Sequence, residues 1–323
     1  MHEAVLDNGI RVVTERRPDV RSVAVGVWIA QGSAHETPES GGVSHLMEHL
    51  VFKGTGRRTA HEIALSLESL GGSLDAYTTR EHTSYQAHVL DEHLPVALDV
   101  LADLVLHPRL DPNDLELEKD VVIEEIAGVE DTPDDMVFDL HGAKFWNGHA
   151  YGQPILGTRE TVRAFEIDDL RSLHSERYQG RNIVLGCVGN IEHDDVVSQL
   201  MELFGGVGAG CVSPEIEEPA DTISGRNSVV RDAAQAHLVI SHATPSFADP
   251  VRNALILISG AFGGGMSSRL FQRIREELAL AYSVYAFQSF YSKAGMAGVY
   301  VGTRPEASEK ALERILFEYG KLC

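Results

Sequence analysis

Residues 41–56 read GGVSHLMEHLVFKGTG and place His45, Glu48 and His49 within five positions. Ser44 follows two glycines and is a suitable N-cap, so the stretch predicts a helix through HLMEHLVF. At about 100° per residue, the three side chains fall within an arc of about 100° on one helix face. The two imidazoles lie one turn apart, so their ring nitrogens can converge on one metal ion.

Glu48 would stand beside such a metal without being a ligand. A carboxylate in that position can take a proton from a metal-bound water, whose pKa the metal lowers to about 7. The alternative is an amphipathic helix whose histidines face solvent, because an HxxEH pattern also arises by chance. The rest of the chain must decide between these interpretations.

A third ligand is expected from the acidic segment LELEKDVVIEEIAGVE, residues 115–130. Glu118 and Glu125 lie seven residues apart, which is close to two helical turns and therefore one face. Val121 and Val122 between them are apolar, so this face can be buried, and a buried carboxylate needs a cation or a partner. The alternative is a solvated acidic face. Periodicity does not choose between Glu124 and Glu125.

Bulk composition excludes several classes of protein. The chain has 323 residues, a formal net charge of -21 and three cysteines at wide spacing. Such an acidic surface repels nucleic acid and anionic membranes, and the cysteines fit a reducing compartment without a disulfide framework. The N-terminus lacks a signal peptide, and no apolar run is long enough to span a membrane. We therefore expect a cytoplasmic protein.

The length predicts two domains. Residues 205–227 lose periodicity and are rich in Gly, Pro, Ser and acidic residues, as linkers are. This predicts a first domain over 1–204, a linker over 205–227 and a second domain over 228–323. The expected fold class is α+β, with two related domains that each pack a mainly antiparallel sheet against helices.

The second domain repeats the order of the first. The strand AQAHLVISHAT (234–244) corresponds to VRSVAVGVWIAQGS (20–33), and the helix SSRLFQRIREEL (267–278) corresponds to the helix over 59–70. A strand pair and a further helix follow in both halves. Nothing in the second half corresponds to residues 108–205, so we expect the second domain to be incomplete and the chain to be a fragment or a truncated product.

The combination HLMEH, FKGT and EKDVVIEEI resembles the pitrilysin/insulinase family of zinc metallopeptidases, in which the motif order is HxxEH. The short two-domain form is similar to bacterial processing proteases and to the β-subunit of the mitochondrial processing peptidase. The resemblance implies one Zn²⁺ per chain, held by His45, His49 and Glu125. It makes Glu48 the general base and Glu118 a supporting carboxylate.

Two further segments fit the same family. GGGMSSRLFQRIREELALAYSVYAF (263–287) is similar to a signature whose arginine and tyrosine reach the substrate, which implies catalytic roles for Arg275 and Tyr282. LDAYTTREHTSY (74–85) resembles the substrate-binding edge strand. Its substrate-binding residues would be Asp75, Ala76, Tyr77 and Thr78. Asp75 stands where the family commonly has Asn, and we expect it to favour basic peptides.

The resemblance implies a zinc-dependent endopeptidase that hydrolyses extended peptides in a chamber between two domains. The expected protein is bacterial, and a homodimer or a pairing with a related subunit is compatible with the family. The main alternative is a non-catalytic peptide-binding or scaffold subunit, or a chain inactivated by C-terminal truncation. A zinc hydrolase that is not a protease is a weaker alternative.

Overall fold

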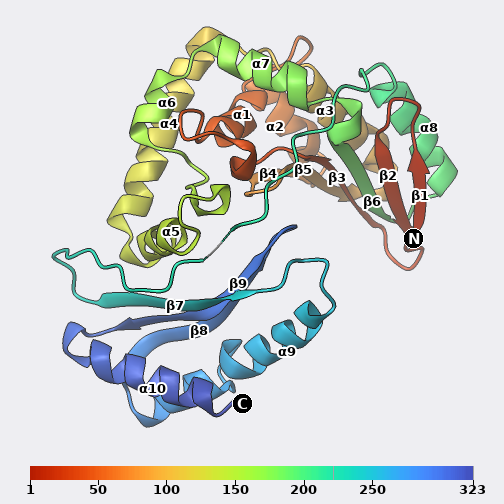
Figure 1. The fold of residues 1–323 in the computed structure, drawn as a ribbon. Helices are drawn as coiled ribbons and strands as arrows, with labels where there is room; N and C mark the ends of the chain where they lie inside the picture. Colours follow the sequence, from red (N-terminus) through yellow and green to blue (C-terminus); the bar gives the residue numbers. More distant parts are fainter. Residues whose placement is uncertain (221, 323) are drawn as a thin grey trace. The chain divides into compact units, whose positions relative to one another are not determined.

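The computed structural model describes residues 1–220 and 222–322, which form two compact units (Figure 1). The first unit comprises Met1–Ile126 and Gln153–Glu215, and the second comprises Ala127–Gly152 and the chain from Ile216 onward. Asp221 of the predicted linker and Cys323, the third cysteine, lie outside the described residues. The predicted domain boundaries at 204 and 228 stay a prediction.

The first unit is built on a six-stranded sheet with the order β1-β2-β6-β3-β5-β4. Its pairs are antiparallel except β2 with β6, which run parallel. The strands are β1 (His2–Val5), β2 (Arg11–Arg16), β3 (Ser22–Ile29), β4 (Ser73–Thr78), β5 (Thr83–Leu90) and β6 (Ile183–Gly189). The sequence interpretation missed β1, which is short; Asn8-Gly9 forms the turn that joins it to β2.

Helices pack against this sheet, with α1, α2 and α3 next to β3, β4 and β5, and α8 next to β2 (Figure 1). The helices that begin in this unit are α1 (Val43–Val51), α2 (Ala60–Glu68), α3 (Leu94–Leu106), α4 (Pro112–Asp131), α6 (Arg159–Ala164), α7 (Ile167–Arg177) and α8 (His193–Phe204). Helices α6 and α7 are separated by the two residues Phe165 and Glu166. Short 3₁₀ turns occupy Ser33–His35, Asp91–His93 and Gly180–Asn182.

Two sequence patterns account for local features of this unit. Thr59 caps α2: its hydroxyl accepts a hydrogen bond from the Glu62 amide, and the Glu62 carboxylate accepts one from the Thr59 amide. The Val-rich β3 is buried along most of its length because the sheet covers both its edges and helices cover one face. Met47 and Leu50 of α1 are fully buried against this core. The core therefore holds the histidine-bearing helix firmly.

The second unit is built on a three-stranded antiparallel sheet with the order β7-β9-β8. Its elements are α5 (Pro133–Phe145), β7 (Ala236–Thr244), α9 (Val251–Gly263), a π-helical segment (Phe271–Glu277), β8 (Ala281–Phe290), β9 (Gly295–Thr303) and α10 (Ser308–Gly320), with 3₁₀ turns at Ala150–Gly152 and Pro305–Ala307. Helices α9 and α10 pack on one face of this sheet. On the other face, Phe138 of α5 stacks on Tyr300 and meets Phe287 edge-on.

The fold is therefore α+β with two related units, as predicted. Strands β7, β9 and β8 follow the same spatial order as β3, β5 and β4, and helices separate the first two strands of each set along the chain. Helices α5 and α9 were not assigned from the sequence. None of the helices formed by residues 1–220 and 222–322 combines the length and the apolar character needed to cross a bilayer.

Candidate metal centre

The N-terminus of α1 is organised by a glutamate and a glycine. Ser44 was expected to be the N-cap, and this is wrong: Gly42 is the N-cap, with φ 94°. A Cβ on Gly42 would lie 2.6 Å from the carbonyl oxygen of Leu156, so a larger residue does not fit. The Glu36 carboxylate accepts hydrogen bonds at 2.8 Å from the amides of Gly42 and Ser44, which satisfies donors that a cap would otherwise serve.

The structure brings His45 and His49 of α1 together with Glu125 of α4. Their ligand-type atoms all lie within 4.8 Å of one another. The Glu125 Oε2 atom is 3.6 Å from His45 Nε2 and 3.7 Å from His49 Nε2. The two imidazole centroids are 4.6 Å apart. The Nε2 atoms of the two histidines therefore face the same carboxylate oxygen.

These three side chains fit a zinc ion. Zinc–ligand bonds of about 2.0–2.2 Å at tetrahedral angles put neighbouring ligand atoms about 3.4 Å apart, close to the distances seen here. Burial lowers the pKa of His45 to about 4, and the neighbouring His49 adds to this shift. The His45 imidazole is thus neutral at neutral pH, as a metal ligand must be. Glu125, with 45% of its side chain exposed, leaves the site open on one side.

Glu118 lies behind His49 and fixes its orientation. Its Oε2 atom accepts a hydrogen bond from His49 Nδ1 at 3.0 Å, so the other ring nitrogen, Nε2, is the one turned toward Glu125. Only 5% of the Glu118 side chain is exposed, and Lys53 Nζ lies 2.5 Å from its Oε1. A carboxylate that holds the second nitrogen of a histidine is the usual outer partner of a metal ligand.

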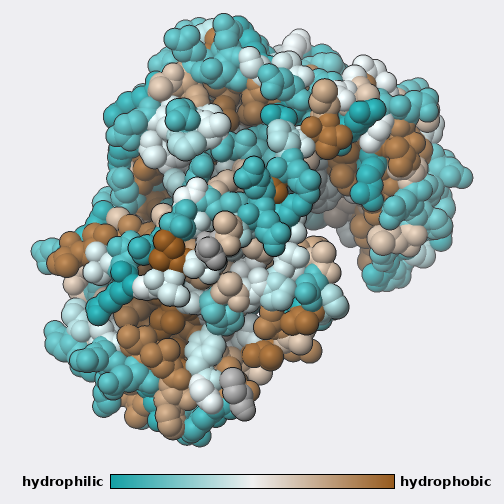
Figure 2. Space-filling model, viewed as in Figure 1, coloured by the Kyte–Doolittle hydropathy of each residue, from teal (hydrophilic) through white to brown (hydrophobic). Residues whose placement is uncertain are grey.

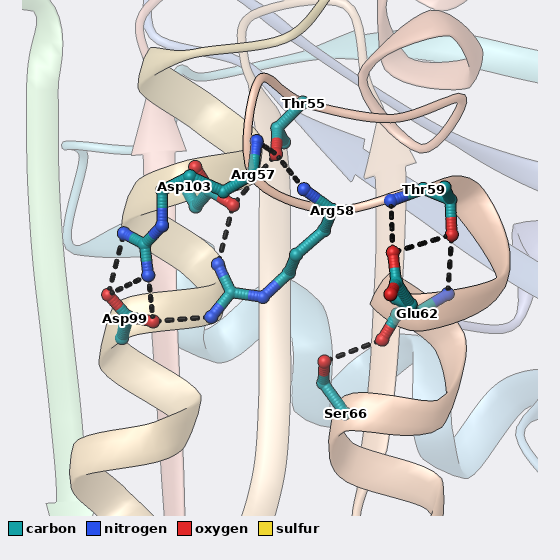
Figure 3. A network of polar contacts seen from close by, with 8 residues as sticks. All are labelled: Thr55, Arg57, Arg58, Thr59, Glu62, Ser66, Asp99 and Asp103. Atoms are coloured by element: carbon teal, nitrogen blue, oxygen red, sulfur yellow. Dashed lines mark hydrogen bonds and ion pairs between the residues drawn. The ribbon is translucent and has the colours of Figure 1, made fainter.

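The loop that carries Lys53 is attached to α3 by charged side chains (Figure 3). Thr55 Oγ1 donates to Asp103 at 2.8 Å, and Arg58 lies 2.5 Å from both Asp99 and Asp103. Arg57 forms a bidentate pair with Asp99. Because Asp103 is almost fully buried, these contacts fix the loop that places Lys53 against Glu118.

Glu48 lies beside the three ligand-type residues and does not join them. Its Oε2 atom accepts a hydrogen bond from Thr78 Oγ1 at 2.6 Å. Burial raises the pKa of Glu48, while the Thr78 hydrogen bond and the charge of His49 act in the opposite direction. A half-buried carboxyl whose pKa burial raises is suited to taking up a proton.

Thr78 is the last residue of β4, which is the edge strand of the first sheet. Thr78 and Ala76 lie on the face of β4 that packs toward α1, whereas Asp75 and Tyr77 lie on the opposite face and are exposed. The sequence interpretation placed all four in a substrate-binding strand. Their binding role stays a prediction.

Arg275 and Tyr282 belong to the second unit. The Arg275 guanidinium lies 4.7 Å from the centroid of the Tyr282 ring and 4.7 Å from that of Phe271. Tyr282 is 74% exposed. The two residues line a shallow pocket of about 320 Å³ with Leu280 and Thr303. Their catalytic roles also stay predictions.

Sequence reasoning missed the contacts of Glu36, Lys53 and the Thr78 hydroxyl. FKGT was used to identify a family, but the role of its lysine beside Glu118 was not foreseen, since 65 residues separate the two. Thr78 was expected to bind substrate, and its hydrogen bond to Glu48 was not foreseen. An acid shortly before a Gly-Gly pair is the signal that could have identified Glu36 as the group that caps α1.

Comparisons with known proteins identify sequences and structures similar to this chain. A family model described as insulinase (peptidase family M16) matches residues 11–159, and a model described as peptidase M16 inactive domain matches residues 164–323. A Bacillus subtilis protein named as the uncharacterized zinc protease YmxG is 42% identical over 95% of this chain and 75% of its own length. A Mycobacterium leprae protein, the uncharacterized zinc protease ML0855, is 42% identical over 93% of this chain and 68% of its own length.

A solved structure described as a protease from Helicobacter pylori has the same fold, with a TM-score of 0.92 over 99% of this chain and 79% of its own. Its sequence identity is 22%. This likeness concerns the fold alone.

Proposed function

The chain belongs to the insulinase (M16) peptidase family, and on that premise we propose that it is a zinc-dependent endopeptidase of extended peptides. The observation that carries the proposal is the meeting of His45, His49 and Glu125 around one point, with Glu48 beside it. The zinc ion would be held by these two imidazoles and one carboxylate. When bound, it would supply Lewis-acid chemistry to the scissile carbonyl and to the attacking water.

Glu48 carries out the proton transfers in this proposal. Its carboxylate takes a proton from the attacking water and later delivers it to the leaving amine. Burial favours the uncharged carboxyl, which supports the first half of this cycle, the uptake of a proton from the water. Glu118 keeps His49 in the orientation and tautomer that direct Nε2 to the metal.

An extended peptide would bind by adding a strand to the free edge of β4. Main-chain hydrogen bonds would give affinity for many sequences, and the exposed Asp75 would favour basic side chains on that face. Matched peptides that differ by one Arg or Glu should therefore be cleaved at different rates, and equal rates would remove the role of Asp75. The roles of Arg275 in holding the peptide and of Tyr282 in donating to the oxyanion remain proposals.

In this proposal the protein acts on peptides in the cytoplasm. It binds neither nucleic acid nor membranes. A homodimer or a pairing with a related subunit is the proposed form of assembly. The absence of nucleic-acid and membrane binding is proposed from the net charge of -21, and the form of assembly is proposed from the family.

The test combines metal removal with one substitution. The zinc-loaded protein should cleave a quenched fluorogenic peptide library, lose activity with a chelator and regain it with added zinc. Glu48→Gln should reduce kcat by at least about 10²–10⁴-fold and keep one zinc per chain by elemental analysis. Glu68→Gln, at an exposed position on α2, is the matched control and should keep full activity.

The outcomes separate the alternatives. A zinc-loaded protein that binds peptides without cleaving them would be a peptide-binding subunit. A protein that hydrolyses small esters but no peptide would be a different zinc hydrolase. A protein that cleaves peptides equally well after Glu48→Gln does not use the proposed mechanism.

A further inference from the structure

The hydroxyl of Thr78 joins the edge strand β4 to the proposed general base. Thr78 Oγ1 donates to Glu48 Oε2 at 2.6 Å, a short distance that is typical of hydroxyl–carboxylate hydrogen bonds. We propose that Thr78 is a positioning residue that holds the Glu48 carboxylate in its working orientation and so couples peptide binding on β4 to the base. This inference rests on the proposed function.

The direction of the hydrogen bond follows from proton counting. A threonine hydroxyl has one proton to donate. Thr83 Oγ1 lies 3.4 Å from Thr78 Oγ1 but donates its own proton to the backbone carbonyl of Gln31 at 2.9 Å. The Thr78 hydroxyl therefore donates its proton in the hydrogen bond to Glu48. Because Thr78 binds Oε2 of Glu48, we assign the proton transfers to the other carboxylate oxygen, Oε1.

Polar contacts hold α1 at two points, one from Gln31, which follows β3, and one from the end of β4. Gln31 Nε2 donates to Ser44 Oγ in the first turn of α1, and Thr78 holds Glu48 one turn later. Helix α1 is thus fixed at its start, while the Glu48 side chain depends on the end of an edge strand. A free glutamate side chain would have several rotamers to lose before it could act as a base.

A bound peptide would order this strand. In the β4–β5 ladder, Thr78 pairs with Thr83, and β4 has a partner on one edge only within the described sheet. A peptide strand added to the other edge would restrain the backbone of Thr78 and, through its hydroxyl, the Glu48 carboxylate. Correct strand addition would therefore increase the fraction of molecules in which the base is aligned.

The test compares Thr78→Val, which keeps the shape and removes the hydroxyl, with Thr78→Ser, which keeps the hydroxyl. Measurements are made on the zinc-loaded full chain with a fluorogenic peptide that the wild type cleaves. Thr78→Val should lower kcat by about 10- to 100-fold, the range for losing a hydrogen bond to a charged group. KM should change by less than about twofold, since backbone pairing is retained, and Thr78→Ser should restore most of kcat.

Thr14→Val is the matched control. Thr14 is a buried threonine of the same sheet whose hydroxyl bonds His193 on α8, far along the sheet order from β4. It should keep the wild-type kcat. Zinc affinity, measured by competition with a chromogenic chelator, should be the same in all four proteins.

Several results would overturn the inference. They are an unchanged kcat in Thr78→Val, a loss confined to KM, a fall in zinc affinity that explains the loss, or a Thr78→Ser variant as slow as Thr78→Val. A zinc-loaded wild type that cleaves no peptide overturns the proposed function and this inference with it. An active wild type with an equally active Thr78→Val overturns the inference alone.

Discussion

The two units share a three-stranded core but not its chemistry. In the first unit, β3, β5 and β4 form the core, with α1 and α2 between the first two strands along the chain and α3 after the last. In the second unit, β7, β9 and β8 repeat this order, with α9 and the π-helical segment in the place of α1 and α2 and with α10 in the place of α3. The same backbone plan thus occurs twice.

The equivalent helices differ in what they carry and in how they are covered. Helix α1 carries two imidazoles and a carboxylate, and seven of its nine residues are buried. Helix α9 has Arg252 as its one charged residue, and it exposes a run of apolar side chains in which Leu257 is 75% exposed. The brown surface over α9 in Figure 2 shows this apolar face.

Helix α1 is more buried than α9 and lies beside carboxylates because the first unit adds elements to the shared three-stranded core. Helix α4 brings Glu118 and Glu125 to α1, α7 packs against α1, and β6 pairs with the second edge of β3. Strand β7 has one partner in its sheet, β9. A repeated fold thus becomes a candidate metal centre only where a later helix supplies carboxylates to the same point.

The first prediction tests whether the carboxylate on α4 is what distinguishes the first unit from the second. Glu125→Gln should weaken zinc binding by more than about 100-fold, beyond the loss usual for an outer partner, and should abolish peptide cleavage. Glu124→Gln, the neighbouring exposed acid, should retain one zinc per chain. Chelator competition and elemental analysis measure both variants, and zinc retained by Glu125→Gln would exclude Glu125 as a ligand.

The second prediction tests how differently the two helices are packed. Leu50 of α1 is 1% exposed and Leu257 of α9 is 75% exposed. In zinc-free protein, Leu50→Ala should lower the free energy of unfolding by about 2–5 kcal/mol, and Leu257→Ala should change it by less than about 0.5 kcal/mol. Urea denaturation measures both. Equal losses would show that the α9 face is packed in solution.

The third prediction concerns the carboxylate behind His49. Glu118→Gln should weaken zinc binding by about 10- to 100-fold, because an amide holds the imidazole less strongly than a carboxylate. The matched control is Glu116→Gln on the same helix, whose side chain is 71% exposed. If both variants bind zinc as the wild type does, Glu118 has no role toward the metal.

The smallest expected effect is on the pH dependence of the first unit. His174 stacks on Tyr178 and donates from Nε2 to the carbonyl of Val105, and burial lowers its pKa. A lowered pKa means that the unfolded chain binds a proton first as the pH falls below about 6.5, so stability is complete above that pH and is lost below it. One proton contributes a slope of at most about 1.4 kcal/mol per pH unit.

His174→Gln cannot take up that proton and keeps a donor for Val105. Its unfolding free energy, measured by urea denaturation between pH 7.5 and 5.5 on a wild-type reference, should therefore fall less steeply with acid. Parallel pH profiles for the two proteins would contradict the assignment of a neutral, buried His174.

Local patterns predicted the elements that have strong signals. The helix predicted over 59–70 is present as α2, and Thr59 caps it. Helix α9, a nearly continuous apolar run with interspersed glycines, was not assigned from the sequence. The cap of α1 was assigned to Ser44, whereas Glu36 satisfies the amides from outside the helix.

The sequence by itself determined that two imidazoles and a carboxylate share one face of a short helix, since the period of a helix fixes the directions of residues one turn apart. Tertiary structure decided the partners of that face. Glu125 rather than Glu124 turns to the imidazoles, Lys53 meets Glu118, and Thr78 holds Glu48. These contacts join residues 30–80 positions apart, and only the packing of α4 and β4 against α1 brings their side chains within reach.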